Sequence, residues 1–143
     1  MKIVVDANII ISALFNLNSR ISELIIQPPA KFQYYTPAYA LIEIEKHRKK
    51  ILSYSKLTTE ELDEAMSLLF FNIRLIDDII IPEKIKIASE LKVKQIDIYD
   101  APYLALADYL KAILWTGDKQ LQKGLIKIGF NNVVTTAELS SFI

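Results

Sequence analysis

The sequence predicts an α/β protein in which helices cover both faces of a parallel sheet. Short apolar segments rich in β-branched residues alternate with helical patterns along the whole chain, and this alternation is typical of parallel sheets. The first apolar segment, Ile3–Val5, runs directly into the carboxylate of Asp6. Burying an unpaired charge costs several kcal/mol, whereas the carboxyl end of a central strand opens into the crevice where such sheets bind ligands. Asp6 is therefore the first candidate site residue.

The first predicted strand, Ile3–Val5, is followed by predicted helices over Ala7–Phe15 and Ser22–Gln27 and by a second strand over Phe32–Tyr35. Asn18 and Ser19 are suited to cap the second helix, and the prolines at 28 and 29 end it.

The next predicted elements are two helices. Thr36 and Pro37 are expected to provide the N-cap and the first-turn proline of a helix of about fifteen residues. Thr58 and Glu61 have the spacing of a capping box, which marks the start of the following helix.

The remainder of the chain continues the alternation without a repeat, a low-complexity tract or a linker. Its predicted strands are Asn72–Ile76, Ile113–Thr116 and Val133–Val134. Its predicted helices are Pro82–Leu91, Pro102–Tyr109, Asp118–Ile128 and Thr136–Phe142. We therefore expect one domain over residues 1–143.

The length and composition fit that expectation. A chain of 143 residues buries roughly 68–70% of its unfolded surface on folding. Hydrophobic residues make up 52% of the sequence, above the usual range of about 45–50%. The surplus indicates that a partner covers some apolar surface, and a homodimer is the simplest such partner.

The composition also excludes several classes of function. The absence of Cys excludes disulfides, thiolate metal sites and Cys nucleophiles. A single His, His47, gives little material for a Ser-His-Asp triad. Three glycines leave no room for a glycine-rich loop that cradles phosphates.

Charge and hydropathy limit the partners. Seventeen basic residues balance 17 acidic ones, so any binding of nucleic acid must use a local positive patch. No apolar stretch has the roughly 18–20 residues of a membrane span, and Asp6 interrupts what would be the apolar region of a signal peptide. We expect no membrane association and a cytoplasmic location.

Four further acids stand in positions that surface solubility explains poorly. Glu43 lies among apolar residues, near the edge of the apolar stripe of its helix. Asp97 and Asp100 are three residues apart at the start of a helix, and Asp118 follows an apolar strand. If the strands before Asp6 and Asp118 are parallel neighbours, both carboxylates emerge at the same edge of the sheet.

Simpler interpretations exist for four of the five acids. Asp100 and Asp118 can cap the helices that they open, and Asp97 fits a solvated turn. Only Asp6 has no comparable alternative, because capping does not explain a charge in so apolar a setting. Taken together, the acids favour one shared site.

The helix that contains Glu43 also offers surface ion pairs, which are the simpler interpretation of Glu43 and the ordinary one of Glu45. Glu43 can pair with Lys46 or His47, and Glu45 has Lys49 in the favourable i,i+4 position.

Several carboxylates in one crevice repel one another and need a counter-charge. Mg²⁺ or Mn²⁺ would supply it, because hard divalent cations take oxygen ligands. Such an ion activates water and neutralises the charge that develops on a phosphoryl oxygen, so no nucleophilic side chain is required. Phosphodiester hydrolysis is the reaction class that best fits these residues.

Four stretches of the chain form a recognisable pattern, namely Ile3–Asn8, Ala40–Ile44, Asp97–Ala107 and Trp115–Lys119. In the order and spacing of these stretches, the chain resembles the PIN-domain nucleases over essentially its full length, and the last two stretches are the most specific. The resemblance implies a three-layer α/β/α sandwich with a central, mostly parallel sheet. It also implies a Mg²⁺- or Mn²⁺-dependent ribonuclease with RNA as its substrate.

The resemblance assigns the catalytic, metal-binding acids of the family to four residues of this chain, Asp6, Glu43, Asp100 and Asp118. Asp97 matches an auxiliary acidic position, Thr116 would orient Asp118 or a water, and Asn8 would hold Asp6 by a hydrogen bond. Many small stand-alone members are toxins of the VapC kind, which form homodimers and are inhibited by a small antitoxin protein. The same partners are implied here.

Candidate RNA contacts lie beside two of these acids, at Arg48, Lys49, Lys119 and Lys123. The basic run at 47–50 also fits a solvated helix end, where cations are favoured. Tyr99 and Tyr103 are candidate stacking surfaces for unpaired bases, although Tyr103 fits core packing because its helix is otherwise apolar.

Two other functions share part of the pattern. A non-catalytic PIN-like module would bind RNA or protein without cutting, but the four acids are all present. A receiver-type phosphoacceptor domain has similar layers. It requires paired acids near the first strand and an acceptor Asp in mid-chain, which fits this sequence less well.

Overall fold

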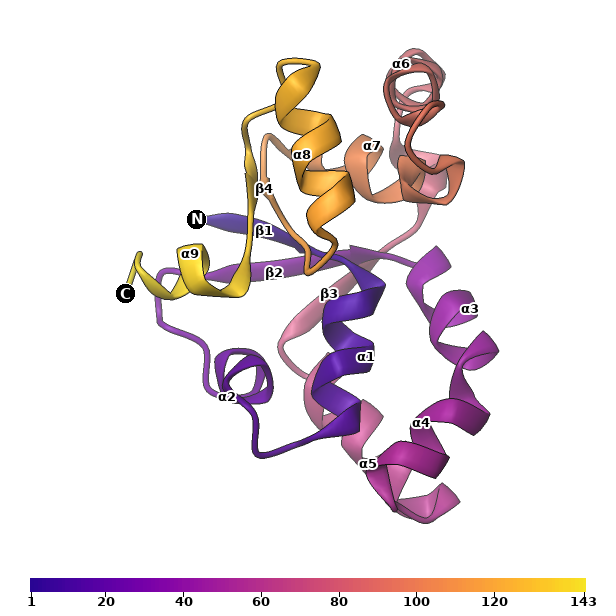
Figure 1. Cartoon of the computed structure of the whole chain (residues 1–143), viewed down its shortest axis with the longest axis vertical. Coiled ribbons are helices and arrows are strands. Elements are labelled where there is room, and N and C mark those ends of the chain that lie inside the picture. The colour runs from indigo at the N-terminus through magenta and orange to yellow at the C-terminus, as the bar shows by residue number, and fades with distance from the viewer.

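Five parallel strands form one sheet with helices on both faces, in the computed structural model of residues 1–143 (Figure 1). The strands are β1 (Lys2–Val5), β2 (Gln33–Pro37), β3 (Ile73–Ile76), β4 (Ile113–Trp115) and β5 (Val133–Val134). Their order across the sheet is β3-β2-β1-β4-β5, and every pair is parallel. The α/β fold with three layers is thus confirmed.

The strand order reverses between β1 and β4. The chain builds outward from β1 through β2 to β3, and then returns to place β4 on the other side of β1. Val5 at the end of β1 pairs with Trp115 at the end of β4, and the backbone N–H of Asp6 donates to the Trp115 carbonyl at 3.0 Å. Open α/β sheets bind ligands at such a reversal.

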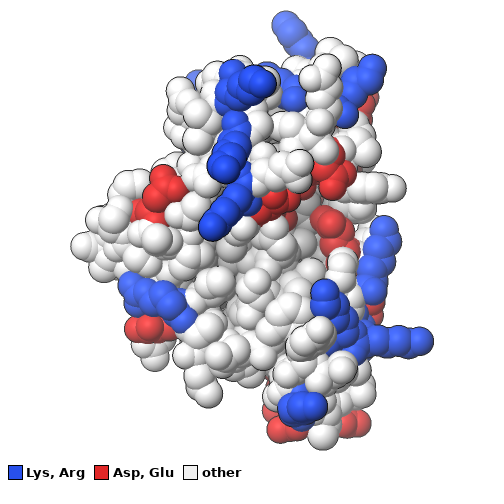
Figure 2. All heavy atoms as spheres, in the orientation of Figure 1, with Lys and Arg blue, Asp and Glu red and all other residues white.

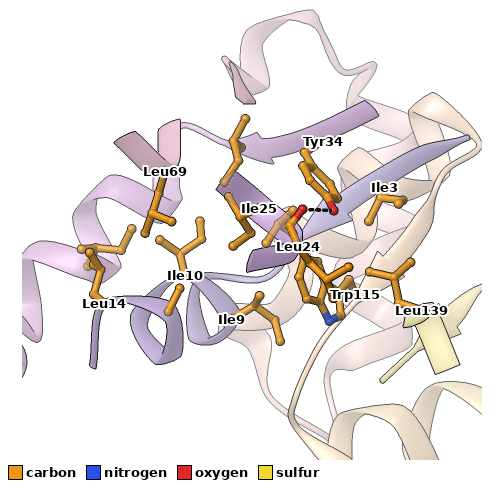
Figure 3. Close-up of a cluster of buried hydrophobic side chains, with 14 of the residues drawn as sticks. Ile3, Ile9, Ile10, Leu14, Leu24, Ile25, Tyr34, Leu69, Trp115 and Leu139 are labelled. Atoms are coloured by element: carbon orange, nitrogen blue, oxygen red, sulfur yellow. Dashed lines mark hydrogen bonds between the residues drawn. The ribbon is translucent and has the colours of Figure 1, made fainter. Parts of the chain in front are cut away.

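The sheet separates two hydrophobic cores because side chains alternate between its faces. Ile3 and Val5 pack into one core and Val4 into the other. Figure 3 shows the first core, where the Tyr34 hydroxyl donates to the Leu24 carbonyl at 2.7 Å. Burial on both faces explains the uninterrupted apolar pattern of β1.

The helices fall into groups that match these cores. The first core contains residues of α1 (Ala7–Phe15), α2 (Arg20–Ile26), α4 (Arg48–Ser55), α5 (Thr59–Phe70) and α9 (Thr136–Ser140). The second contains residues of α6 (Glu83–Val93), α7 (Ala101–Leu110) and α8 (Lys119–Lys127). α3 (Tyr39–Lys46) contributes Ile44 to the first and Ala40 to the second. No single helix is long and apolar enough to span a membrane; α1 and α2 reach that length only as a pair bent by 111°.

The helix predicted from Thr36 begins later and is broken. Thr36 and Pro37 belong to β2, where Pro37 pairs with Ile76 of β3. The Thr36 hydroxyl donates to the Val5 carbonyl at 2.7 Å, so it serves the sheet and caps no helix. α3 then begins at Tyr39 without a side-chain cap. It ends at Lys46, and α4 follows after the non-helical backbone of His47.

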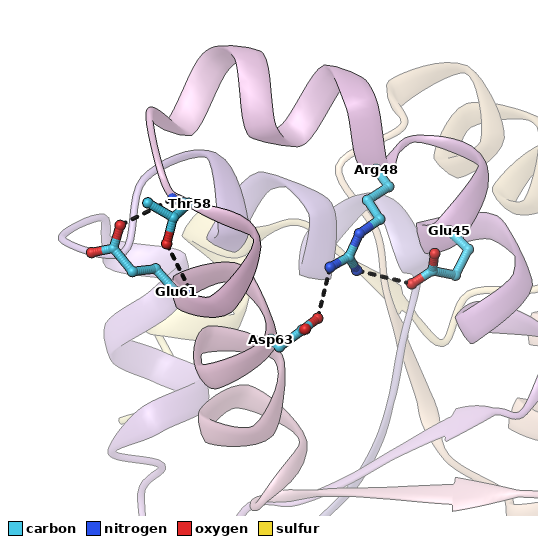
Figure 4. Close-up of polar contacts among 5 residues, drawn as sticks. All are labelled: Glu45, Arg48, Thr58, Glu61 and Asp63. Atoms are coloured by element: carbon cyan, nitrogen blue, oxygen red, sulfur yellow. Dashed lines mark hydrogen bonds and ion pairs between the residues drawn. The ribbon is translucent and has the colours of Figure 1, made fainter.

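Several predicted boundaries are confirmed. Ser19 caps α2, and Thr58 with Glu61 forms the capping box of α5 (Figure 4). A second capping box, Thr135 with Glu138, starts α9 and was not predicted. Two short 3-10 helices, η1 (Asp78–Ile80) and η2 (Ile98–Asp100), were also not predicted.

Arg48 fixes the junction of α3 and α4 against α5. Its guanidinium contacts Glu45 at 3.2 Å and Asp63 at 2.7 Å (Figure 4). Glu45 therefore pairs with Arg48, and the predicted pair with Lys49 is not formed.

Candidate active site

Asp6 lies at the reversal of the sheet and is 5% exposed. Its Oδ2 accepts a hydrogen bond from the Thr116 hydroxyl at 2.7 Å, and its Oδ1 accepts a longer one from the Asn8 backbone N–H at 3.5 Å. The carboxylate thus emerges from β1 and is held by the end of the neighbouring strand.

Thr116 links two of the predicted acids. Its oxygen donates to Asp6 and accepts from the backbone N–H of Asp118 at 3.1 Å. Thr116 therefore contacts the backbone of Asp118, whose orientation it was predicted to fix, while its hydroxyl proton goes to Asp6. The predicted bond from Asn8 to Asp6 comes from the backbone, because the Asn8 side chain accepts from the Gly117 N–H at 3.4 Å.

The capping interpretation applies to Asp118 but not to Asp100. Asp118 Oδ1 accepts from the N–H groups of Gln120 and Leu121, at 2.9 and 3.1 Å, at the start of α8. Asp100 makes no such cap, and its Oδ2 is buried without a hydrogen-bond partner. Asp97 is exposed and accepts from the Tyr99 N–H at 3.0 Å, as a turn residue does.

Glu43 reaches the site from α3 and is held by α7. The Tyr103 hydroxyl donates to Glu43 Oε1, and Tyr103 is 1% exposed, which leaves it no face for base stacking. Neither predicted surface pair of Glu43 forms. His47 bonds the Glu43 backbone carbonyl at 2.8 Å, and the Lys46 ammonium lies 5.9 Å from the Tyr99 ring centroid.

The acids influence one another electrostatically. Burial, opposed by the hydrogen bond from Thr116, raises the pKa of Asp6 to about 6, with a further contribution from the charges of Glu43 and Asp118. Burial also raises the pKa of Asp100 to about 7, and the other four acids of the group all add to that shift. The four other acids that the sequence singled out therefore lie close enough to Asp100 to disfavour its ionised form.

The residues present fit a hard divalent cation. The five acids offer carboxylate oxygens, which such ions prefer, and Asp100 Oδ2 is a buried acceptor without a partner. No three carboxylate or imidazole groups stand in metal-binding geometry, and Glu43, Asp6 and Asp118 each make other hydrogen bonds. Binding an ion through three acids therefore requires their carboxylates to move from the positions they have in this structure.

Basic side chains flank the acids on two sides. Figure 2 shows acidic groups between a column of basic side chains over α8 and a second basic group over α3 and α4. Lys119 and Lys123 are exposed on α8, and Lys49 is exposed on α4. The Arg48 guanidinium is engaged by Glu45 and Asp63.

Two tyrosines lie at the site in roles that were not predicted from the sequence: Tyr39 was not singled out, and Tyr103 was considered only as a stacking surface or a core residue. Tyr103 holds Glu43, and Tyr39 lies close enough that burial and the charges of Glu43, Tyr99 and Asp97 raise its pKa. Helical spacing was an available signal, because Tyr103 is three residues after Asp100 and Tyr39 is four before Glu43.

The fold and the site define a class of protein, a three-layer α/β/α domain with an acidic cluster at the switch point of its sheet. The chain belongs to the PIN domain family, whose model matches residues 4–139. PIN domains are generally nucleases that use divalent metals.

Among solved structures, the chain is similar to one described as a toxin-antitoxin complex from Klebsiella pneumoniae. The TM-score is 0.59 at 21% identity, and the match covers 93% of this chain and 96% of that chain. At this identity the similarity shows a common fold. No curated protein matches the chain.

Proposed function

We propose that the protein is a Mg²⁺- or Mn²⁺-dependent endoribonuclease that hydrolyses RNA phosphodiester bonds. The observation that carries this proposal is the buried, unpartnered oxygen of Asp100, whose pKa is raised by burial and by the charges of the surrounding acids. Protein interiors seldom leave a buried acceptor unsatisfied. An ion would both satisfy it and neutralise the group.

The residues that would hold the ion are Asp6, Glu43, Asp100 and Asp118, with Asp97 at the side. When bound, the ion supplies positive charge that activates water and stabilises the phosphoryl oxygens. Thr116 holds the Asp6 carboxylate and the Asp118 backbone in fixed positions, and Tyr103 aims Glu43 into the site. Such preorganisation is what catalysis by positioning requires.

The test is RNA cleavage by the purified protein with Mn²⁺. We expect Asp6→Asn to abolish cleavage while the chain remains folded, because it removes a charge and keeps the shape. Asp108→Asn is the matched control, since Asp108 is an exposed acid of α7 outside the site. Cleavage at the wild-type rate in excess chelator contradicts the proposal. RNA binding without cleavage in any metal identifies a binding module instead.

We further propose that the chain is the toxin of a toxin–antitoxin pair and forms a homodimer. The fold similarity to a structure described as a toxin-antitoxin complex supports the pairing. Large apolar side chains are strongly exposed, including Phe71 at 87% and Ile79 at 80%, which supports a covering partner. Sedimentation tests the dimer. Growth arrest on induced expression, absent with Asp6→Asn and relieved by the product of the adjacent gene, tests the pair.

A further inference from the structure

Helix α8 presents a row of three lysines without counter-charges. Lys119, Lys123 and Lys127 are spaced four residues apart, which brings them close together along the helix surface. All three are exposed, and none forms an ion pair. Figure 2 shows the resulting column of basic side chains over α8.

The row is unfavourable for the isolated helix. Like charges at i,i+4 destabilise a helix by about 0.2–0.5 kcal/mol per pair, and α8 contains no acidic residue to offset them. Lys119 is also the first residue of α8, where the helix dipole disfavours a cation. The dipole accounts for Lys127 in the last turn but not for Lys119 or Lys123.

The row continues into a groove between α6 and α8. Lys127 lines this groove together with Lys92 and Lys94, and no acidic residue takes part in the lining. The two walls approach closely at Gly124, where an added Cβ would lie 2.6 Å from Ile96 Cδ1. We call the five residues Lys92, Lys94, Lys119, Lys123 and Lys127 the lysine track.

The track starts at the candidate active site. Lys119 directly follows Asp118, and the row then runs away from the acids for about 12 Å along α8, at 1.5 Å per residue. A surface that repeats positive charge along a line suits a chain that repeats negative charge along a line. The track lacks the forked donors that would single out one carboxylate.

We propose that the lysine track binds the phosphate backbone of the RNA on one side of the bond that is cleaved. This inference rests on the proposed function and extends it, because it assigns the substrate an extended course from the acids along α8 to the groove beside α6. Binding by the track depends on backbone charge and is therefore insensitive to base sequence.

The experiment measures binding of a single-stranded RNA to the Asp6→Asn protein in chelator, at several salt concentrations. The track variant is Lys119→Gln, Lys123→Gln and Lys127→Gln together. Its control is Lys2→Gln, Lys56→Gln and Lys84→Gln, which changes net charge equally at exposed lysines without ion pairs.

We expect the track variant to reduce the slope of log affinity against log salt by about 2, since each phosphate contact on single strands contributes about 0.7. When salt is raised from 50 to 200 mM, the affinity for RNA of the protein with the unmodified track should then fall roughly 15- to 20-fold more than that of the track variant. The control should retain the full slope.

Two outcomes overturn the proposal. An equal reduction in the control shows that net charge, and not position, determines binding. An unchanged slope in the track variant shows that the lysines serve another partner, such as an acidic protein segment. A track-dependent slope in a protein that cleaves no RNA retains this inference and removes the proposed function alone.

Discussion

Asp100 shows how a single carboxyl can oppose folding and support function. Its buried Oδ2 has no partner, and its pKa of about 7 lies well above the ordinary value of 3.8 because burial and four neighbouring acids disfavour its ionised form. Asp6 is shifted in the same direction, to about 6. Both residues therefore make the metal-free protein less stable once they ionise.

The sign of the pH dependence follows from these shifts. Between pH 3.8 and about 7 the folded chain keeps protons that the unfolded chain has released. Stability thus decreases as pH rises through this window. We expect the metal-free protein to melt at a lower temperature near pH 8 than near pH 5.

The substitution Asp100→Asn should reduce the dependence of thermal stability on pH. The amide cannot ionise, so the variant should melt higher than the wild type near pH 8 and similarly near pH 5, while RNA cleavage is lost. Thermal melts of both proteins in chelator at the two pH values provide the measurement. Parallel pH curves for the two proteins contradict the assigned role of Asp100.

The substitution Tyr103→Phe should weaken metal binding, because Tyr103 holds the carboxylate of Glu43. The change removes only the hydroxyl that Glu43 accepts from, and a hydrogen bond to a charged group is worth about 1.5–3 kcal/mol. We expect the variant to need more Mn²⁺ for half-maximal thermal stabilisation. Tyr109→Phe is the control on the same helix, because the Tyr109 side chain is 38% exposed and makes no hydrogen bond in the structure.

A double-mutant cycle separates positioning from general loss of packing. In a Glu43→Gln background the Tyr103→Phe change should have a smaller effect on Mn²⁺ dependence, because its partner is already altered. Additive effects of the two changes indicate that Tyr103 acts on the fold alone.

At the scale of elements, α8 is positioned by a glycine in its interior. A mid-helix Gly costs roughly 0.8–1.0 kcal/mol relative to Ala, and at Gly124 a Cβ would meet Ile96 at 2.6 and 2.9 Å. The close approach of α8 to the segment after α6 explains why this residue type is used.

Gly124→Ala should therefore change the stability of the chain differently in two backgrounds. With Ile96 present, the clash should cancel or exceed the gain in helix propensity. With Ile96→Ala, the same change should stabilise the chain by about 1 kcal/mol relative to Gly. Denaturant unfolding of the four proteins gives the comparison, and equal effects in both backgrounds argue against the close approach.

The helices and strands that could be predicted from the sequence are those fixed by residues close together in the chain. β1 is an unbroken apolar run because both of its faces are buried, and the box of Thr58 and Glu61 defines the start of α5. The predicted start of a helix at Thr36 was wrong because a non-local interaction, the pairing of Pro37 with Ile76, competes with a local cap.

The same distinction applies to the candidate site. A carboxylate directly after an apolar strand could be predicted to lie at the sheet edge, and Asp6 and Asp118 do so. The bond between Tyr103 and Glu43 could not be predicted, since it depends on how α7 and α3 are placed although 60 residues separate the two.

At the scale of the whole molecule, the acids are assembled from both ends of the chain around one reversal of the sheet. An ion that binds this assembly only in the folded state must raise the free energy of unfolding. At a concentration 100-fold above Kd the gain is about 2.7 kcal/mol, which corresponds to roughly 5–10 °C in Tm for a chain of this size.

Melting with and without Mn²⁺ tests this coupling. We expect the full shift in the wild type and in Asp108→Asn, and little shift in Asp118→Asn, which keeps a side-chain oxygen for the α8 cap but loses the charge. An equal shift in all three proteins places the ion elsewhere.

The hydrogen bond from Thr116 to Asp6 also has a consequence for synthesis of the chain. The two residues are 110 positions apart, so β1 has no partner on that side until β4 has left the ribosome. A nascent chain that ends at Leu110 contains Asp6, Glu43 and Asp100 but neither β4 nor Asp118. Such a chain has an incomplete site, so under the proposed function we expect no cleavage by the nascent chain before β4 and Asp118 have been added.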